Sequence, residues 1–425
     1  MSTLAPSRRT FITGSLAAAG MLGLAACGGG FSNTGGRTTL NFWINPPGSV
    51  GLPTMQGLVD EFEKTNPDIK VKLRTFTGYA ALLQAVQSSV AAGQPPDVAQ
   101  IGYNYINYAA KAYPMVSLDD LGVKLDGYPR NILAMGQSGG RQVGAPYGLS
   151  DLVVYYNADV LGAAGLDATK PPSTWEQWRQ AAAAIKASQS MPAITFQRFP
   201  GDNYILQTMT ESNGGSILGC SNGIYSSGVA SAESVQAVEF MVQLIKDGLS
   251  LEVQTAQASQ SFLAGQTATL ITGSSSTQTL RQQAGFRLDI APLPSFGTKP
   301  RRIPGGGNSL CSFAKTAAGE QAAGKLISFL TSANSFETWV QKTGYLSPRE
   351  GVARERAASD KFISVAEAQM ADLVPWASFP GPKGLQGSQV LDDAVTAILG
   401  GQTDARAGLT EAARKLNELI GSEHC

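Results

Sequence analysis

The stretch Thr39-Leu-Asn-Phe-Trp-Ile44 predicts a strand, and it opens a regular alternation of strands and helices near the start of the chain. The elements expected after it are a helix at Leu52–Thr65, a strand at Ile69–Phe76, a helix at Tyr79–Ala92 and a strand at Val98–Ile101. Strands that alternate with helices of about 10–15 residues favour βαβ units and a parallel sheet. The sequence therefore predicts an α/β fold.

A second α/β segment follows the apolar stretch Val153–Asn157, which predicts another strand. A helix is expected to start within Pro171–Glu176, because Ser173 or Thr174 can cap it and a carboxylate follows in its first turn. Further helices are expected at Ser231–Gly248, Ala317–Ser332, Ser335–Thr343 and Gln389–Ile420, the last with a break at Gly400-Gly401. We therefore predict two α/β lobes.

The first 26 residues have the features of an export signal. Arg8-Arg9 resembles a twin-arginine signal, and the apolar run Ile12–Ala26 is shorter than the ~20 residues that a membrane-spanning helix needs. Leu24-Ala25-Ala26-Cys27 resembles a lipobox, in which the cysteine is lipidated and becomes the mature N-terminus. We expect a signal peptide over residues 1–26 and a flexible tether over residues 27–36, with Cys27 lipidated.

The composition of the remaining residues fits a large soluble body. Hydrophobic residues make up 43% of the chain and charged residues 15%, so the chain can bury a sizeable core. Arg8 and Arg9 are the only charged residues of the leader, so the remaining 399 residues carry a net charge of −2. Such a chain offers no electrostatic footprint for nucleic acid, and no later apolar run has the length of a membrane span.

The chain has a single histidine, His424, next to its C-terminus. This nearly excludes Ser-His-Asp and Cys-His catalytic groups and His-based metal sites. The adjacent carboxylates Asp119-Asp120 and Asp392-Asp393 are more typical of solvated faces or caps than of a catalytic pair. Gly319–Lys325 matches the start of a phosphate-binding loop, but Leu326 replaces the magnesium-binding hydroxyl and the residues between are helix formers. We expect no catalytic residue, no metal site and no cofactor.

Three cysteines follow the lipobox: Cys220, Cys311 and Cys425. Export permits a disulfide, and Cys220–Cys425 is the pair to test, although three cysteines leave one unpaired and the sequence cannot choose it. Cys311 lies in Ser309–Phe313, which fits a buried strand where the cysteine is a small hydrophobic residue.

Glycines and aromatic residues give the positive signal for a ligand site. Gly305-Gly306-Gly307-Asn308 either permits close approach of the backbone to a ligand or forms a tight turn between lobes. Ligands of open α/β sheets lie beyond the carboxyl ends of strands, and sugars are held by aromatic faces and polar groups. Aromatic residues fall at such ends at Trp43, Tyr79, Tyr103, Tyr105, Tyr204, Tyr345 and Trp376. Any one of them is more often core than ligand contact, so the set carries more weight than its members.

Several stretches, in order along nearly the whole mature chain, resemble the extracellular solute-binding proteins of ATP-driven importers. The similar branch includes maltose-binding and glycerol-3-phosphate-binding proteins. The stretches are Leu40–Trp43, Gly93–Val98, Ala145–Ser150 with Val154–Asn157, Pro171–Trp175, Phe262–Thr269, Ala291–Pro294 and Thr343–Arg349. Several are weak alone, but the ordered set is specific.

The resemblance implies a two-lobe periplasmic-binding-protein-like fold with hinge crossings and a ligand cleft between the lobes. Crossings are expected near residues 148–151, 302–307 and 344–349. The N-terminal lobe would comprise residues 37–148 plus 305–345, and the C-terminal lobe residues 149–304 plus 346–425.

The resemblance also implies ligand contacts at matching positions. These are Tyr79, Tyr103 and Asn104 in the first lobe, Ser150 and Asp151 at the first crossing, Tyr204 and Ser274 in the second lobe, and Gly307, Asn308 and Tyr345 at the later crossings. Trp43 and Trp376 join this set as aromatic residues at element ends.

Two departures from the family pattern bear on the substrate. The glycerol-phosphate branch carries an arginine after a Lys-Gly-Leu-like stretch, whereas Lys383-Gly384-Leu385 is followed by Gln386 in a shortened loop. Tryptophans expected near residues 199–204 are replaced by Phe199 and Tyr204. Without the arginine a phosphate loses its bidentate partner, so a neutral sugar or glycoside is favoured, although Lys383 could supply a point charge.

We therefore expect a lipid-anchored, monomeric substrate-binding component of an ABC importer at the outer face of the cell membrane. It would capture a carbohydrate by closure of two lobes and deliver it to the permease subunits without covalent chemistry. The alternatives are a glycerol-3-phosphate- or glycerophosphodiester-binding protein of the same family, an exported carbohydrate-active enzyme, and a surface adhesion or scaffold protein. Turnover of glycans would indicate the enzyme, and a lack of saturable small-ligand binding would indicate the adhesion protein.

Overall fold

The computed structural model describes residues 36–198, 201, 203–251, 255–352 and 354–425. Arg37–Cys425 forms one compact unit. The predicted signal peptide, Cys27 and most of the predicted tether lie outside the described residues. None of the described helices has the length and apolar character needed to cross a membrane.

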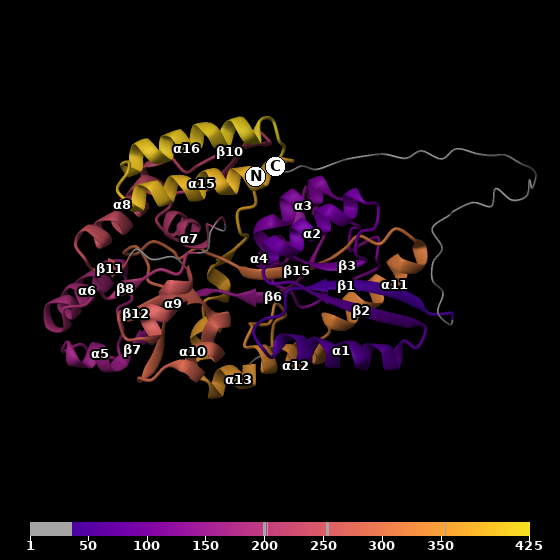
Figure 1. Ribbon diagram of the computed structural model, residues 1–425, viewed down its shortest axis with the longest axis horizontal. Coiled ribbons are helices and arrows are strands. Elements are labelled where there is room, and N and C mark those ends of the chain that lie inside the picture. The colour runs from indigo at the N-terminus through magenta and orange to yellow at the C-terminus, as the bar shows by residue number, and fades with distance from the viewer. Residues whose placement is uncertain (1–35, 199–200, 202, 252–254, 353) are drawn as a thin grey trace, which may run out of the picture. The chain divides into compact units, whose positions relative to one another are not determined.

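The larger sheet has the strand order β2-β1-β3-β15-β6 and contains the predicted βαβ units (Figure 1). Its strands are β1 (Thr38–Ile44), β2 (Ile69–Thr75), β3 (Val98–Gly102), β6 (Ala145–Ser150) and β15 (Gly306–Ser312). β1 pairs in parallel with β2 and β3, as the sequence predicts. β15 runs antiparallel to β3 and β6, so the expectation of a parallel sheet is wrong on this side. The chain reaches β15 from β14 (Ile303–Pro304) and not through a crossover helix that follows a neighbouring strand of this sheet. A parallel direction is therefore not imposed on β15.

Helices pack on both faces of the larger sheet (Figure 1). One group consists of α1 (Gly51–Thr65), α11 (Ala317–Leu330) and α12 (Ala333–Thr343), and the other of α2 (Tyr79–Ala91) and α3 (Ile106–Ala112). Side chains alternate between the two faces along a strand. In β1, Phe42 and Ile44 belong to the hydrophobic cluster of the first group, whereas Trp43 belongs to that of the second.

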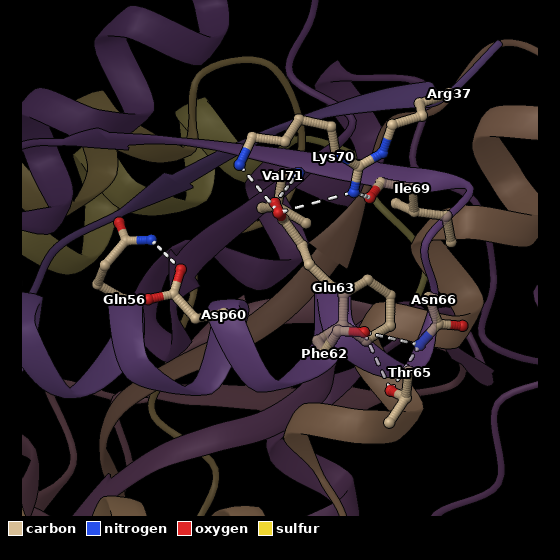
Figure 2. A network of polar contacts seen from close by, with 10 residues as sticks. All are labelled: Arg37, Gln56, Asp60, Phe62, Glu63, Thr65, Asn66, Ile69, Lys70 and Val71. Atoms are coloured by element: carbon tan, nitrogen blue, oxygen red, sulfur yellow. Dashed lines mark hydrogen bonds and ion pairs between the residues drawn. The ribbon is translucent and has the colours of Figure 1, made fainter. Parts of the chain in front are cut away.

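A polar network ties α1 to the edge of this sheet (Figure 2). The Glu63 carboxylate of α1 accepts a hydrogen bond from the Val71 amide of β2 at 2.8 Å and forms an ion pair with Lys70 at 2.9 Å. Arg37 donates to the Ile69 carbonyl at 2.8 Å and lies 3.8 Å from the same carboxylate. These contacts fix the end of α1 against the outermost strand.

The smaller sheet has the order β12-β7-β13 and is antiparallel throughout. Its strands are β7 (Leu152–Asn157), β12 (Thr269–Gly273) and β13 (Leu288–Pro292). Only Asp151 separates β6 from β7, so the chain passes there from the larger sheet to the smaller one. It returns after β13 through β14 (Ile303–Pro304), which pairs with β16 (Leu373–Val374). The residue limits of the two lobes remain predictions.

The remaining elements surround these sheets. The helices are α4 (Arg130–Leu133), α5 (Ala158–Ala163), α6 (Trp175–Gln189), α7 (Tyr204–Ser212), α8 (Ala232–Lys246), α9 (Thr255–Leu263), α10 (Thr277–Gln283), α13 (Arg354–Ser359), α14 (Lys361–Glu367), α15 (Gly384–Leu399) and α16 (Ala405–Ile420). The short strands are β4 (Gln137–Ser138), β5 (Arg141–Gln142), β8 (Ile194–Thr195), β9 (Leu218–Ser221), β10 (Ile224–Ser227) and β11 (Ser250–Leu251). At the start of α6, Thr174 and Gln177 form a capping box, which confirms the predicted helix start.

The C-terminal stretch forms α15 and α16, which lie side by side (Figure 1). The predicted break at Gly400-Gly401 is confirmed. α15 begins at Gly384 rather than at Gln389, so Lys383 and Gln386 lie at the N-cap and in the first turn of a helix instead of in a loop. Gly384 contacts the Phe379 backbone and Gly387 contacts its ring, and this tertiary packing outweighs the low helix propensity of glycine.

Cys220 and Cys425, the pair that the sequence analysis selected for testing, form a disulfide. The bond joins the β9–β10 hairpin to the C-terminus, where the Cys425 amide donates to the Gly223 carbonyl at 3.1 Å. Cys311 is free and buried in β15, as its apolar surroundings in the sequence indicate.

Gly319–Lys325, which matches the start of a phosphate-binding loop, lies within α11. The helical prediction for this segment is confirmed. Most of its amides are engaged in helix bonds and are not presented to a phosphate.

Candidate ligand-binding site

Glycines of β3, β6 and β15 allow side chains to lie directly against the larger sheet. Gly148 lies opposite Asn308, and a methyl group on Gly148 would lie 2.6 Å from the Asn308 Nδ2 atom. A methyl group on Gly306 would lie 2.8 Å from the Tyr204 hydroxyl. Gly307 has a φ of +121°, which favours glycine, and a methyl group on Gly307 would lie 2.0 Å from the Gly148 carbonyl oxygen. Gly306 and Gly307 lie within strand β15, where the lack of a side chain lets neighbouring atoms approach the backbone closely. The tight turn that the sequence also allowed is not observed.

One half of the site is a hydrogen-bonded group of side chains, Asn45, Tyr79, Asn308 and Tyr345, here called the tyrosine–asparagine group. The Asn308 Nδ2 atom donates to the Tyr79 hydroxyl at 2.8 Å, and that hydroxyl also interacts with the Asn45 and Tyr345 side chains. Burial raises the pKa of Tyr79 and raises that of Tyr345 further, so both phenols stay neutral. Asn308 Oδ1 is buried and has no hydrogen-bond partner among the described residues. This acceptor is therefore unused within the described residues.

The other half is the aromatic pair Tyr204 and Trp376. Their ring centroids lie 4.4 Å apart with an interplanar angle of 26°, which is a stacked arrangement. Tyr204 is the first residue of α7 and its hydroxyl donates to the Ser150 carbonyl at 3.5 Å. Tyr204 also lies close enough to Tyr345 to contribute to the raised pKa of that phenol. The two halves of the site are therefore neighbours.

Asp151 lies fully buried at the crossing from β6 to β7. Its Oδ2 atom accepts a hydrogen bond from Gln369 Nε2 at 2.6 Å, and its amide donates to Ser274 Oγ at 3.2 Å. The Ser274 amide donates in turn to the Asp151 carbonyl at 2.8 Å. Burial raises the pKa of Asp151 to about 7, although these bonds and Arg301 oppose the shift. Asp151 and Ser274 thus bind each other at the point where the chain crosses between the sheets.

The structure places the predicted residues in four settings. The glycine-lined region brings together Tyr79, Asn104, Ser150, Tyr204, Gly307, Asn308, Tyr345 and Trp376. Asp151 and Ser274 adjoin it at the crossing. Tyr103 is buried in the main hydrophobic cluster.

Trp43 lies apart from these groups, in the cluster between the larger sheet, α2 and α3. Its ring centroid is 5.2 Å from that of Phe76, and the Arg74 guanidinium lies 4.7 Å over the Trp43 ring. Arg74 therefore covers one face of the indole. Whether Trp43 or any other residue of the set contacts a ligand remains a prediction.

The sequence analysis did not identify three side-chain amides of this region, those of one asparagine and two glutamines, as site residues. Asn45 directly follows the end of β1, and this position beyond a strand end could have identified it as a candidate site residue. Gln207 lies three residues after Tyr204 on α7, so a helical pattern brings both to one face. Gln369 comes from a distant segment, and no local pattern links it to Asp151.

Positive charges that adjoin this region are neutralised in pairs. Arg301 forms an ion pair with Asp372 at 2.7 Å, and Arg302 lies 3.9 Å from Glu211. Lys383, whose point charge the sequence analysis considered for a phosphate, is exposed at the start of α15. The contacts of the site thus consist of hydroxyls, amides and rings beside one buried carboxyl group.

Comparison with known proteins agrees with this architecture. The family model of the bacterial extracellular solute-binding proteins matches residues 57–369, and the chain belongs to this family. The sn-glycerol-3-phosphate-binding periplasmic protein UgpB of Brucella melitensis is 26% identical over 414 residues, which cover 91% of this chain and 94% of that protein. The UgpB of Shigella dysenteriae is 25% identical over 433 residues, which cover 94% and 95%.

Solved structures establish the fold. A cyclic alpha-maltosyl-1,6-maltose binding protein from Arthrobacter globiformis aligns with a TM-score of 0.80 at 19% identity, covering 91% of this chain and 99% of that chain. UgpB from Mycobacterium tuberculosis, in complex with glycerophosphocholine, aligns with a TM-score of 0.78 at 21% identity and the same coverage. The predicted two-lobe periplasmic-binding-protein-like fold is confirmed. The family consists of binding proteins, so the enzyme alternative is wrong.

Proposed function

We propose that this protein is the substrate-binding component of an ABC importer and that it captures a neutral carbohydrate between its lobes. The observation that carries this proposal is the buried, unpartnered Asn308 Oδ1 atom, beside neutral tyrosines and close to a stacked aromatic pair. A sugar offers hydroxyl donors for such an acceptor and C–H faces for such rings. The predicted contact residues would bind the sugar together as the lobes close.

The charges of the site support a neutral ligand. A phosphate is normally held by arginine or by a free cation, and Arg301 and Arg302 are already paired with carboxylates. Asp151 would repel an anion whenever it is ionised. Gln386 stands where the glycerol-phosphate branch carries an arginine and cannot replace its charge.

The second candidate is a glycerol-3-phosphate or a glycerophosphodiester. Curated relatives that match over most of the chain are named for sn-glycerol-3-phosphate, and one solved relative holds glycerophosphocholine. Lys383 at the N-cap of α15 could supply the charge, aided by the positive end of that helix.

Calorimetric titration at low and high salt distinguishes the two candidates. Maltose, maltotetraose, glycerophosphocholine and glycerol-3-phosphate serve as probes. We expect a maltodextrin to bind with little salt dependence, because no exposed ion pair needs to be screened. Tight binding of glycerophosphocholine, competition by glycerol-3-phosphate and no binding of either sugar would overturn the preference for a carbohydrate.

We further propose that the mature protein is a monomer, tethered through lipidated Cys27 to the outer face of the membrane. The lipobox-like sequence and the lack of a spanning helix among the described residues support this. Cys27→Ala should release the protein from the membrane fraction, since acyl chains would supply the attachment. Cys311→Ala, at a buried free cysteine, is the matched control. Retention of unlipidated Cys27→Ala protein on membranes would contradict the anchor, and a stable dimer on size-exclusion chromatography would contradict the monomer.

A further inference from the structure

Trp376 lies in a stretch that has no regular secondary structure of its own. The stretch runs from the end of β16 at Val374 to the start of α15 at Gly384. No strand or helix ladder supports the backbone there, so the direction of the indole depends on contacts from other elements.

Gln207 of α7 supplies such contacts on both sides of Trp376. Its Nε2 atom donates to the Pro375 carbonyl at 3.0 Å, and its Oε1 atom accepts a hydrogen bond from the Ala377 amide at 2.8 Å. One side-chain amide therefore binds the residue before the indole and the residue after it. Gln207 itself is 2% exposed, so its side-chain amide relies on these bonds and not on water.

A third bond agrees with the orientation of this amide. The Nε2 atom also donates to Glu211 Oε1, one turn later on α7, at 3.0 Å. The Pro375 carbonyl can only accept and the Ala377 amide can only donate, so the nitrogen must face Pro375, and with it Glu211, while the oxygen faces the Ala377 amide. A glutamate at this position would face the Pro375 carbonyl with a second acceptor and could not replace the glutamine.

The same helix also supplies the ring on which the indole stacks. Tyr204 lies one turn before Gln207 on α7, and it stacks on Trp376 at 4.4 Å between centroids. α7 thus holds the tryptophan twice, by the ring of Tyr204 against its side chain and by the amide of Gln207 against its backbone.

We propose that Gln207 is a positioning residue for ligand binding, which fixes the Trp376 indole on Tyr204 by clamping the peptide groups on either side of it. The effect on binding rests on the proposed function, in which this aromatic pair contacts the ligand. Gln207 itself acts through Trp376. Loss of the clamp removes the Gln207 partner of the Pro375 carbonyl and of the Ala377 amide, so the backbone on either side of the indole is no longer fixed and the indole samples other directions.

The first test needs no ligand. Acrylamide quenching of Trp376 fluorescence is obtained as the difference between each protein and its Trp376→Phe version. Gln207→Met has a similar length but no hydrogen bonds, and it should increase the quenching of Trp376. Gln142→Met is the matched control, because Gln142 donates to the backbone carbonyls of Leu133 and Gly144 away from the pair. Unchanged quenching in Gln207→Met would overturn the proposal.

The second test is a double-mutant cycle with maltotetraose and glycerophosphocholine as probes. Gln207→Met should weaken the binding of whichever probe the protein binds by about tenfold, the size expected when about one net hydrogen bond is lost. In a Trp376→Ala background it should have no further effect, because the two residues act as one unit. Equal weakening in both backgrounds would overturn the positioning role.

Two outcomes separate this proposal from the proposed function. If neither probe binds the unaltered protein, the proposed ligand classes fail while the quenching test still decides the role of Gln207. If Gln207→Met does not fold, Gln207→Asn replaces it, since its shorter amide cannot reach both Pro375 and Ala377. Unchanged quenching in Gln207→Asn would then overturn the proposal.

Discussion

The two halves of the candidate site are built by different interactions. In the tyrosine–asparagine group, side chains bind one another through hydroxyl and amide groups, and Asn308 retains an unused acceptor. In the aromatic pair, two rings stack and a buried glutamine holds the backbone of one of them. The first half is therefore suited to recognise hydroxyl groups by direction, and the second to supply apolar surface.

The largest effect is expected from breaking the aromatic pair. Tyr204 is 6% exposed, so Tyr204→Ala removes a buried ring as well as the stacking partner of Trp376. We expect the free energy of unfolding to fall by about 3–5 kcal/mol, together with a loss of probe affinity. Urea denaturation and calorimetry measure the two effects. Tyr204→Phe keeps the ring and removes the hydroxyl that donates to Ser150, so it should lose less stability than Tyr204→Ala. Unchanged stability of Tyr204→Ala would show that the ring is not packed.

The next effect concerns the crossing that joins the two halves. Burial raises the pKa of Asp151 from 3.8 to about 7, so the folded state holds a proton that the unfolded chain releases between these values. Stability should therefore decrease as the pH rises from about 4 to 7 and stay low above it, by an amount on the order of 2–4 kcal/mol.

Asp151→Asn should flatten this decrease and make the protein more stable than the unaltered chain at pH 8. The pKa of Glu211 is also raised to about 7 by burial, so part of the slope should remain in the variant. Glu211→Gln measures that part separately. Thermal melts from pH 4 to pH 8 check both variants, and an unchanged slope in Asp151→Asn would contradict the assignment.

A smaller effect is expected in the tyrosine–asparagine group. Asn308→Ala removes both the bond to Tyr79 and the unused acceptor, and it should weaken sugar binding about tenfold. Tyr79→Phe loses the same bond but keeps Asn308 Oδ1, so its affinity should fall less. Calorimetry with maltotetraose compares the two. Equal losses would indicate that the Oδ1 atom does not contact the sugar.

The smallest effect concerns a contact between the stretch that carries Trp376 and helix α3. Ser378 Oγ accepts hydrogen bonds from the Asn107 and Tyr108 amides at 3.1 and 3.4 Å, in the first turn of α3. Ser378→Ala should cost about 1 kcal/mol of stability, as loss of a helix cap does. Faster hydrogen exchange at these two amides is the specific sign. Ser188→Ala, whose hydroxyl bonds within its own helix, should leave them unchanged.

Much of the fold followed from local pattern. The strands and helices between Thr38 and Gly102 agree with the sequence prediction to within a residue or two, because alternation and stop signals are local properties. The direction of β15 and the early start of α15 were missed, because both depend on residues far away in the chain. The prediction that several aromatic residues lie at or near the ends of helices and strands was also correct, since such ends have local sequence signals.

What the sequence by itself determined is the α/β character, the family and the kinds of side chain available for a ligand. Only the tertiary structure decided which of them meet. Asn308 and Tyr79 are 229 residues apart, and the register of β15 against β3 brings them together, because it sets Asn308 opposite Gly102, against which Tyr79 lies. Gln207 and Pro375 are 168 residues apart and meet because α7 packs on β14, the strand that pairs with β16. Strand register and helix packing are set by the burial of whole elements, and no local pattern records them.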